Sequence, residues 1–289
     1  MIPRQLTILG VGLLGGSIGL ALRAAAPQCR IIGWGHRRQT LDKALEIGAV
    51  DAIEMDPAVA ATGSDLVILC TPVGTFEPLL KQLGPSLSAG TLLTDVGSTK
   101  RSVARLAESL LPVGVEFVGS HPIAGSEKRG VEFSRADLFS NQLCLLTPTP
   151  RTKPSALEQI EKFWQSLGMR TARINPEDHD RLLADVSHLP HLLAAALVAM
   201  QDDAGLELCG KGFLDTTRIA GGDGGLWRDI LLDNADNLRA GLRRLQSQLA
   251  IVELMLDSQS KDALRDWLDA AARRRQNVLE KKLREINPD

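Results

Sequence analysis

The sequence is poor in several features that would place the protein in a specialised class. It has no tyrosine, and aromatic residues make up only 3% of its 289 residues. Nothing in the composition accounts for the missing tyrosine. The four cysteines, Cys29, Cys70, Cys144 and Cys209, form no CxxC pair. We therefore expect scattered thiols in a reducing compartment rather than disulfides or a metal site.

Excess charge and long apolar runs are also missing. The net charge is −2, which gives no general attraction to nucleic acid or to a membrane surface. The sequence shows no apolar run of transmembrane length. The N-terminal segment MIPRQLTILGVG enters an expected strand without a signal-peptide cleavage region. We expect a cytoplasmic protein that binds neither nucleic acid nor membrane.

The chain does contain an alternating pattern of strands and helices up to residue 173. Helical patterns such as residues 13–25 and 100–111 separate the expected strands. This order predicts an α/β fold of the Rossmann type, with parallel strands joined by right-handed crossovers, over residues 1–173. The seven apolar segments that predict strands are QLTILGV, RIIGW, DLVILC, TLLTDV, VEFVGS, QLCLLTP and MRTARI.

Residues 174–289 show helical patterns almost throughout, which predicts a second, all-helical domain. The segment ADVSHLPHLLAAALVAM, residues 184–200, is nearly all apolar and is expected to be a buried helix. Further on, a seam of apolar residues spaced three and four apart indicates either internal packing or a subunit interface. The seam consists of Leu242, Leu245, Leu249, Val252 and Leu256.

A glycine-rich turn follows the first expected strand. Gly10, Gly12 and Gly15 in LGVGLLGGS form the pattern GxGxxG between a strand and a helix. In dinucleotide-binding folds these glycines permit a tight turn, close approach of the pyrophosphate and close helix packing, with phosphate at the helix N-terminus. The order of strand, motif and helix favours such a site over an ordinary turn. The expected site also includes Leu13, Leu14 and Thr71.

The end of the second strand indicates which dinucleotide is bound. An NAD site of this kind usually has an acid about 20 residues after the motif, which accepts a hydrogen bond from the ribose 2′-hydroxyl. Gly35 occupies this position, and His36, Arg37 and Arg38 follow it. Arginines can bind a 2′-phosphate that an acid would repel. The sequence therefore favours NADP over NAD, and the alternative is a solvated basic turn.

Two candidate catalytic residues follow later strands. Ser98 in TDVGSTKRSV is expected to cap the next helix, and its hydroxyl can also point into the cleft at the carboxyl ends of the strands. His121 in FVGSHPIAGSEKRG is expected at a strand end, in a loop rich in glycine and proline. There it would be exposed and would titrate near neutrality. This position makes His121 the candidate general base.

The helical half adds further polar candidates. His188 and His191 are three residues apart, but no HExxH motif or nearby carboxylate completes a metal site, so none is predicted. Arg218 lies early in a polar, glycine-rich stretch, LDTTRIAGGDGGLWRDI. This stretch is either a surface loop or the source of a planar donor for a substrate carboxylate.

Together these segments resemble the prephenate and arogenate dehydrogenase family of tyrosine biosynthesis. The resemblance implies a Rossmann domain, a helical dimerisation domain, a homodimer, and oxidative decarboxylation of a small cyclohexadienol. The departure is Gly35-His36-Arg37, where many relatives carry an acid, which puts the use of NAD in doubt. The segments that carry the resemblance, in family order, are GVGLLGGSIGLAL, DVGSTK, SHPIAGSEKRG, ADLF, SHLPHLLAAAL and DTTRIA…LWRDI.

The resemblance also implies roles for individual residues. His121 matches the family's catalytic histidine, and Ser98 matches the serine that hydrogen-bonds near it. Neutral His121 would take the hydroxyl proton while NADP accepts the hydride, and loss of CO₂ would make the ring aromatic. On the substrate side, Arg218 would bind a carboxylate, and the other implied residues are His188, Glu127 and Trp227.

Two other functions fit the same fold. A β-hydroxyacid dehydrogenase or an imine reductase shares the two-domain plan, but the former uses a lysine on an interdomain helix, and SHLPHLLAAALVAM has none. A module that binds NADP without turnover is disfavoured by the combination of His121, Ser98 and Arg218. Prephenate and arogenate differ by a keto or an amino group, and both stay open as substrates.

Overall fold

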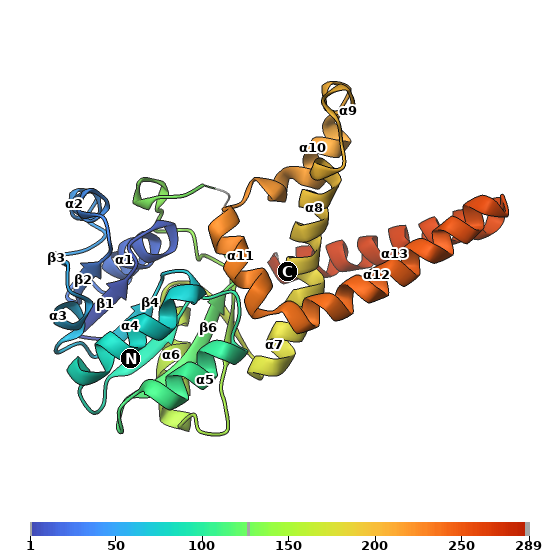
Figure 1. Cartoon of the computed structure of the whole chain (residues 1–289). Coiled ribbons are helices and arrows are strands. Elements are labelled where there is room, and N and C mark those ends of the chain that lie inside the picture. Colours follow the sequence, from blue (N-terminus) through green and yellow to red (C-terminus); the bar gives the residue numbers. More distant parts are fainter. Residues whose placement is uncertain (1, 126–127, 287–289) are drawn as a thin grey trace. The chain divides into compact units, whose positions relative to one another are not determined.

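The computed structural model of the chain describes residues 2–125 and 128–286. It consists of two compact units that divide the sequence between Ala235 and Asp236. In the first unit strands alternate with helices (Figure 1). The described strands are β1 (Gln5–Leu9), β2 (Arg30–Trp34), β3 (Ala52–Glu54), β4 (Leu66–Leu69), β5 (Leu92–Asp95), β6 (Glu116–Pro122), β7 (Leu143–Thr147) and β8 (Arg170–Arg173).

Helices connect most of these strands and confirm the predicted α/β fold. The helix expected over residues 13–25 is observed with the same bounds, and the one expected over residues 100–111 is one residue shorter at each end. The helices between the strands are α1 (Leu13–Ala25), α2 (Arg38–Glu46), α3 (Pro57–Ala61), α4 (Phe76–Leu83), α5 (Arg101–Leu110) and α6 (Pro154–Ser166), with the short helices η1 (Val73–Thr75), η2 (Gly84–Ser86) and η3 (Val131–Phe133).

The sheet is wound in both directions from β1. Its strand order is β3-β2-β1-β4-β5-β6-β7-β8. Leu6 of β1 pairs in parallel with Ile31 of β2 on one side and with Leu66 of β4 on the other. Because the winding reverses between β1 and β4, the carboxyl ends of these two strands form the crevice in which open α/β sheets bind ligands.

Two features of the sheet differ from the sequence expectation. β3 is a strand of three residues that is not among the seven expected ones. β7 runs antiparallel to β6, with His121 opposite Leu145. A parallel neighbour needs a crossover of a dozen or more residues, usually a helix. The described part of residues 123–142 contains only the short helix η3, so the chain turns back instead.

Apolar side chains cover both faces of the sheet. Leu6 and Ile8 of β1 belong to a cluster with Leu22 of α1, whereas Leu9 belongs to a second cluster with Phe76 of α4. Because helices cover both faces of a parallel sheet, its strands are apolar along their whole length. This is why the central strands could be recognised as apolar runs in the sequence.

The cysteines are unpaired thiols, as the sequence suggests. None of the four forms a disulfide. Burial raises the pKa of the Cys29 thiol to about 11, which leaves it protonated and unreactive at neutral pH.

After β8 the first unit continues in helices. α7 (Pro176–Leu183) begins after the capping residue Asn175, whose side chain accepts a hydrogen bond from the backbone N–H of Asp178 at 2.7 Å. Pro190 has no N–H to donate to the preceding turn, and the helix widens there to a π turn. The elements that follow α7 are the π turn η4 (Ala184–His188), α8 (Leu189–Ala199), α9 (Asp203–Glu207), α10 (Lys211–Thr217), η5 (Arg218–Gly221) and α11 (Gly224–Asp233). The domain boundary expected after residue 173 stays a prediction.

The continuous helical stretch Pro176–Ala199 differs from the sequence expectation in two respects. It is long and apolar enough to cross a membrane by length and composition alone. It is also less buried than expected, because within the chain only His191 and Ala194 of α8 are buried. The core helix of a globular domain passes the same test of length and composition. This stretch moreover carries four buried ionisable side chains, His179, Asp180, His188 and His191.

The second unit consists of most of α12 (Ala235–Asp257) together with α13 (Lys261–Ile286) (Figure 1). The predicted seam lies on α12. Two of its leucines, Leu249 and Leu256, are 57% and 59% exposed. Packing within the chain therefore does not bury them.

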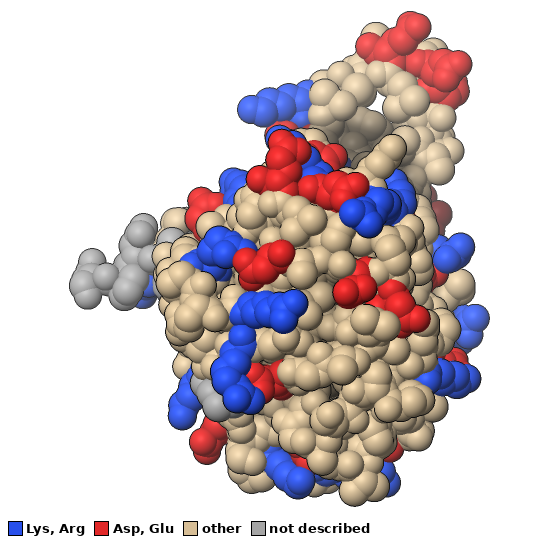
Figure 2. All heavy atoms as spheres, turned by 90° about the vertical axis from the view of Figure 1, so that its left-hand side faces the viewer, with Lys and Arg blue, Asp and Glu red and all other residues tan. Residues whose placement is uncertain are grey.

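The surface carries both signs of charge. On the face seen in Figure 2, Lys and Arg side chains are interspersed with Asp and Glu. Such mixing creates no extended field of one sign. This face therefore offers no basic patch for a polyanion.

Candidate active site

The first part of the site is the glycine-rich turn between β1 and α1. Gly10 has a φ of +107°, and a Cβ there would lie 2.8 Å from the backbone carbonyl carbon of Cys70. A Cβ on Gly15 would lie 2.3 Å from the carbonyl oxygen of Gly10. Both positions therefore require glycine. Gly12 differs from them, because a Cβ there would meet nothing within 4 Å.

The open space at Gly12 suits a phosphate group. Gly12 is the N-cap of α1, makes no side-chain capping bond, and no acid lies in the first helical turn, which begins with Leu13 and Leu14. The N–H groups and the dipole of an uncapped helix N-terminus favour an anion. Thr71, which follows β4, lies beside the turn, since its Cγ2 would be 2.9 Å from a Cβ on Gly10. The turn therefore has the form that a dinucleotide pyrophosphate needs.

The predicted ribose-binding segment is the turn between β2 and α2. A Cβ on Gly35 would make only ordinary contact with Leu41 Cδ2, at 3.5 Å. His36, Arg37 and Arg38 are exposed. Arg38 Nε is 2.8 Å from Asp42 Oδ1, whereas Arg37 has no acidic partner in the described part of the chain. Arg37 is thus the guanidinium that an anion at this turn meets without competition from a carboxylate.

His121 is the second part of the site, and its environment corrects the sequence expectation. It lies inside β6 rather than in a loop, and it is 8% exposed. Burial, with further contributions from His179, Lys100 and His188, lowers the pKa of His121 well below 6.5. The imidazole is therefore neutral at neutral pH rather than half-titrated, and the neutral form is the one that can accept a proton.

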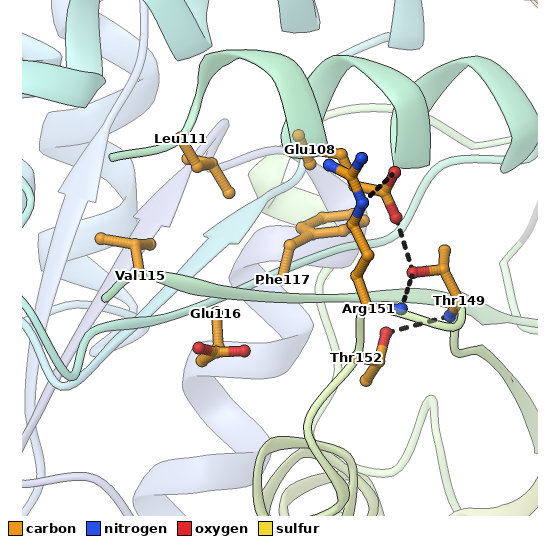
Figure 3. A pocket seen from close by; sticks show the side chains of 9 residues that line it. Glu108, Leu111, Val115, Glu116, Phe117, Thr149, Arg151 and Thr152 are labelled. Atoms are coloured by element: carbon orange, nitrogen blue, oxygen red, sulfur yellow. Dashed lines mark hydrogen bonds and ion pairs between the residues drawn. The ribbon is translucent and has the colours of Figure 1, made fainter. Parts of the chain in front are cut away.

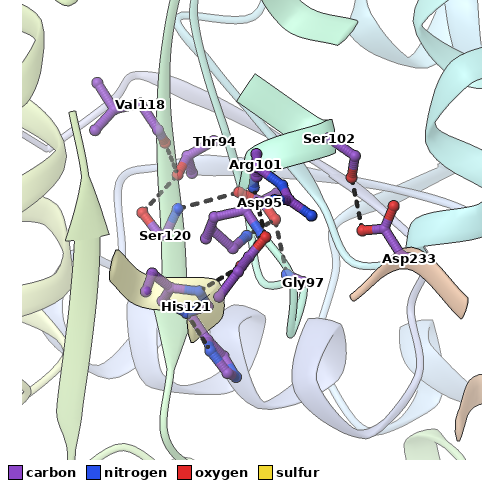
Figure 4. A network of polar contacts seen from close by, with 12 residues as sticks. Thr94, Asp95, Gly97, Arg101, Ser102, Val118, Ser120, His121 and Asp233 are labelled. Atoms are coloured by element: carbon purple, nitrogen blue, oxygen red, sulfur yellow. Dashed lines mark hydrogen bonds and ion pairs between the residues drawn. The ribbon is translucent and has the colours of Figure 1, made fainter. Parts of the chain in front are cut away.

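A chain of hydrogen bonds leads away from His121 (Figure 4). His121 Nδ1 lies 2.9 Å from His179 Nε2, and His179 Nδ1 lies 2.8 Å from Asp180 Oδ1. The Asp180 carboxylate accepts the backbone N–H groups of Lys100 at 2.8 Å and of Arg101 at 3.0 Å. The start of α7 is thereby joined both to His121 and to the N-terminus of α5.

Ser98 does not cap α5, contrary to the expectation. The N-cap is Lys100, which makes no side-chain capping bond, and Asp180 satisfies the first N–H groups instead. Ser98 is half-buried in the loop before the helix. Its backbone lies close enough to His188 to offset a small part of the lowering of that histidine's pKa by burial. The hydrogen bond of the Ser98 hydroxyl near His121 stays a prediction.

A buried ion pair holds the loop that carries Ser98. The Lys100 ammonium is paired with the Asp95 carboxylate at the end of β5, and both side chains are fully buried. Asp95 also accepts the backbone N–H groups of Gly97 at 2.8 Å and of Ser120 at 3.1 Å. The pair joins β5 to β6 next to His121, where the positive charge disfavours protonation of the imidazole.

The helical segment contributes an imidazole and indole cluster. His188 is fully buried, its Nδ1 lies 3.1 Å from Asn234 Nδ2, and burial lowers its pKa to about 4. Trp227 of α11 stacks on His191 with ring centroids 3.5 Å apart, and its edge approaches His188. The structure therefore brings together the predicted His188 and Trp227, and it adds His191.

Two predicted substrate-side residues remain. Arg218 begins η5, which packs against α8, and its side chain is exposed. Its contact with a substrate carboxylate stays a prediction. Glu127 lies outside the described residues.

The sequence interpretation missed His179, Asp180 and Asn234. A signal was present for the first two, because NPEDHDR places His179 and three acids at the start of the long helical stretch Pro176–Ala199. That segment follows the domain boundary expected after residue 173, and no function was assigned to it. Asn234 gives no such signal, since it lies between helices and reaches His188 and the backbone oxygen of Asp180 only in the folded chain.

A separate pocket of about 190 Å³ lies at the opposite, amino end of β6 (Figure 3). Its polar side chains are occupied with one another. Thr149 Oγ1 donates to Glu108 at 2.6 Å, and Arg151 lies 3.8 Å from the same carboxylate. The pocket lies at the end of β6 away from His121, and its second acid, Glu116, is paired with Lys153 at 2.6 Å.

Comparisons with known proteins agree with this arrangement. The family model "Prephenate dehydrogenase, nucleotide-binding domain" matches residues 18–173, and "Prephenate dehydrogenase, dimerization domain" matches residues 175–270. A prephenate dehydrogenase of Bacillus subtilis is 36% identical over 238 residues, which are 80% of this chain and 64% of that protein. The chain thus spans somewhat less than two thirds of that relative.

Two solved structures resemble the whole chain. One is a prephenate dehydrogenase from Aquifex aeolicus in complex with hydroxyphenyl propionate and NAD+, with 32% identity, a TM-score of 0.89, and coverage of 95% of this chain and 98% of that one. The other is a Synechocystis arogenate dehydrogenase, with 30% identity, a TM-score of 0.81, and coverage of 95% and 99%. With both domain models matched in order and these likenesses over nearly the full length, the chain belongs to the prephenate dehydrogenase family.

Proposed function

We propose that the protein oxidatively decarboxylates prephenate, arogenate or both, with a nicotinamide dinucleotide as hydride acceptor, in tyrosine biosynthesis. The observation that carries the proposal is the buried, neutral His121 in β6. In the same sheet, β1 leads into an uncapped helix N-terminus with open space at Gly12. The names of the relatives supply the substrate class.

The residues of the chain divide the chemistry between them. When bound, the dinucleotide supplies the hydride acceptor, and the turn of Gly10, Gly12 and Gly15 would hold its pyrophosphate. His121 takes the proton of the ring hydroxyl as the C–H bond at the same carbon breaks. Loss of CO₂ then makes the ring aromatic. Arg218 supplies a planar donor for the second carboxylate of the substrate.

The direct test is an assay of the purified protein with prephenate or arogenate and either dinucleotide, followed by the absorbance of the reduced cofactor. We expect turnover of at least one substrate and release of CO₂ in equal amount. The His121→Asn protein prepared in parallel controls for contaminating activity. Absence of turnover with both substrates, in protein that binds the dinucleotide, would overturn the proposal.

We further propose that NADP is preferred over NAD. Support comes from Gly35, which leaves space, and from Arg37, which has no acidic partner among the described residues. The Gly35→Asp variant should reverse the preference in kcat/KM by about 10- to 100-fold, because a carboxylate accepts from the 2′-hydroxyl and repels a 2′-phosphate. Gly35→Ala is the matched control, since it adds the Cβ without the charge. A wild-type protein that prefers NAD, as bound in the Aquifex structure, would contradict the proposal.

A homodimer is the proposed assembly, and the cytoplasm is the proposed location. Support for the dimer comes from the match to a dimerization domain and from apolar side chains that the chain itself leaves exposed, including Leu249, Leu256 and Val186. Light scattering at micromolar concentration should give twice the monomer mass of 31.2 kDa.

A further inference from the structure

The hydrogen-bond chain behind His121 has no assigned role, and it is unusually well enclosed. His179 and Asp180 are 0% and 1% exposed. We propose that His179 and Asp180 are positioning residues that fix the tautomer of His121, so that its Nε2 is the atom that accepts the substrate proton. The inference rests on the proposed function, because it concerns the base of that reaction.

Asp180 determines which atom donates and which accepts along the hydrogen-bond chain from Asp180 to His121. Two of its three hydrogen-bond partners are the backbone N–H groups of Lys100 and Arg101, which can only donate. Burial raises the pKa of Asp180, but the hydrogen bonds from His179 and from these backbone groups outweigh it and lower the pKa below its usual value. The carboxylate is therefore ionised and accepts at all three contacts. His179 must consequently carry a proton on Nδ1.

The direction then passes to His121. Burial lowers the pKa of His179, so the ring is neutral, and with its proton on Nδ1 its Nε2 is a lone pair. That lone pair lies 2.9 Å from His121 Nδ1, and a hydrogen bond between two ring nitrogens needs one proton. His121 therefore donates from Nδ1, which leaves its own Nε2 unprotonated and able to act as a base.

The hydrogen-bond chain behind His121 also stabilises the product of proton transfer. When His121 Nε2 takes the proton, the ring becomes an imidazolium whose Nδ1–H points along the chain toward the ionised Asp180. An acid held behind a catalytic histidine orients the ring and stabilises this charge, and loss of the correct tautomer lowers kcat steeply. A purely structural role is separable from this one, because Asp180 caps α5 directly and needs no contribution from His179 to do so.

Substitution of His179 tests the proposal. In His179→Leu the acceptor for His121 Nδ1 is lost, and kcat should fall about 100-fold or more, with KM and dinucleotide affinity changed by less than about threefold. His179→Gln keeps an oxygen that can accept from His121 Nδ1, and it should recover at least about tenfold of the lost kcat.

A matched control disrupts another contact at the same helix end. Ser102 Oγ donates to Asp233 at 2.6 Å and joins α5 to α11, and it makes no contact in the hydrogen-bond chain from His121 to Asp180. Ser102→Ala should lower the melting temperature with kcat unchanged. If His179→Leu behaves like Ser102→Ala, with unchanged kcat, the positioning role is refuted.

A measurement without turnover separates this inference from the proposed function. The protein has five histidines, so ¹⁵N-histidine NMR of the wild type can report the tautomer directly. The signals of His121 are assigned as those that disappear in His121→Asn. We expect a protonated Nδ1 and an unprotonated Nε2 on His121. A protonated Nε2 in the wild type overturns the inference even if His179→Leu fails to fold. The expected tautomer in a protein that converts neither substrate would instead refute only the proposed function.

Discussion

His121→Asn should lower kcat by about 10²- to 10⁴-fold, the usual contribution of a positioned general base. Binding of the dinucleotide should stay nearly unchanged, because the glycine-rich turn between β1 and α1 does not involve this side chain. KM should also change little, since the proposed charge contact of the substrate is Arg218. Steady-state kinetics and titration of the dinucleotide measure the two effects separately.

The wild-type pH profile gives the same prediction a second test. Because the pKa of His121 lies well below 6.5, the base is already neutral at pH 7. The value of kcat/KM should be level across the neutral range and should fall only as the pH drops through that lowered pKa. His121→Asn should abolish this acid limb. An acid limb centred at or above 6.5, or near-wild-type turnover in the variant, would show that His121 is not the base.

Gly12→Ala should weaken dinucleotide binding by roughly 100-fold, the loss of one or two charge-assisted hydrogen bonds, with no loss of stability. The new methyl group meets no protein atom within 4 Å, so it occupies only the space proposed for the pyrophosphate. The melting temperature of the unliganded protein should stay the same or rise slightly, as for other Gly→Ala changes at compatible backbone angles.

Gly15→Ala is the matched comparison. Its methyl group would lie 2.3 Å from the Gly10 carbonyl oxygen, so α1 must shift, at a cost of about 1–3 kcal/mol of stability. Binding and stability should therefore fall together in Gly15→Ala and separate in Gly12→Ala. Unchanged dinucleotide affinity in Gly12→Ala would mean that the phosphates lie elsewhere.

The sequence was sufficient for those parts of the molecule that local chemistry determines. Buried parallel strands must be apolar, and a pyrophosphate turn must have glycine at Gly10 and Gly15, so both are visible in one sequence. The orientation of β7 was not, because it depends on a connection whose described part forms only the short helix η3. The burial of α8 was overestimated for a related reason, since apolar composition does not say whether the same chain supplies the covering surface.

The site was predicted residue by residue but not as a network. His121 was identified by its motif, yet its pKa is lowered first by burial and then by the charges of His179, Lys100 and His188, which only the fold brings near it. Ser98 was expected to cap α5, but Asp180 provides this cap, 80 residues after Lys100 in the sequence. Partners so distant in sequence leave no local pattern, and this limits what spacing and propensity can predict.

The cap that Asp180 places on α5 also bears on synthesis, because the two partners emerge 80 residues apart. The β1–α1 turn and the strands beside it are complete once the first half of the chain has emerged. The Asp180 carboxylate and the Asn234 amide follow much later, and they reach back to Lys100 and to His188. A nascent chain that has not reached residue 180 therefore contains the glycine-rich turn, while the backbone N–H of Lys100 lacks its acceptor and His121 lacks His179. The carboxylate proposed to orient the base is added only when α7 forms.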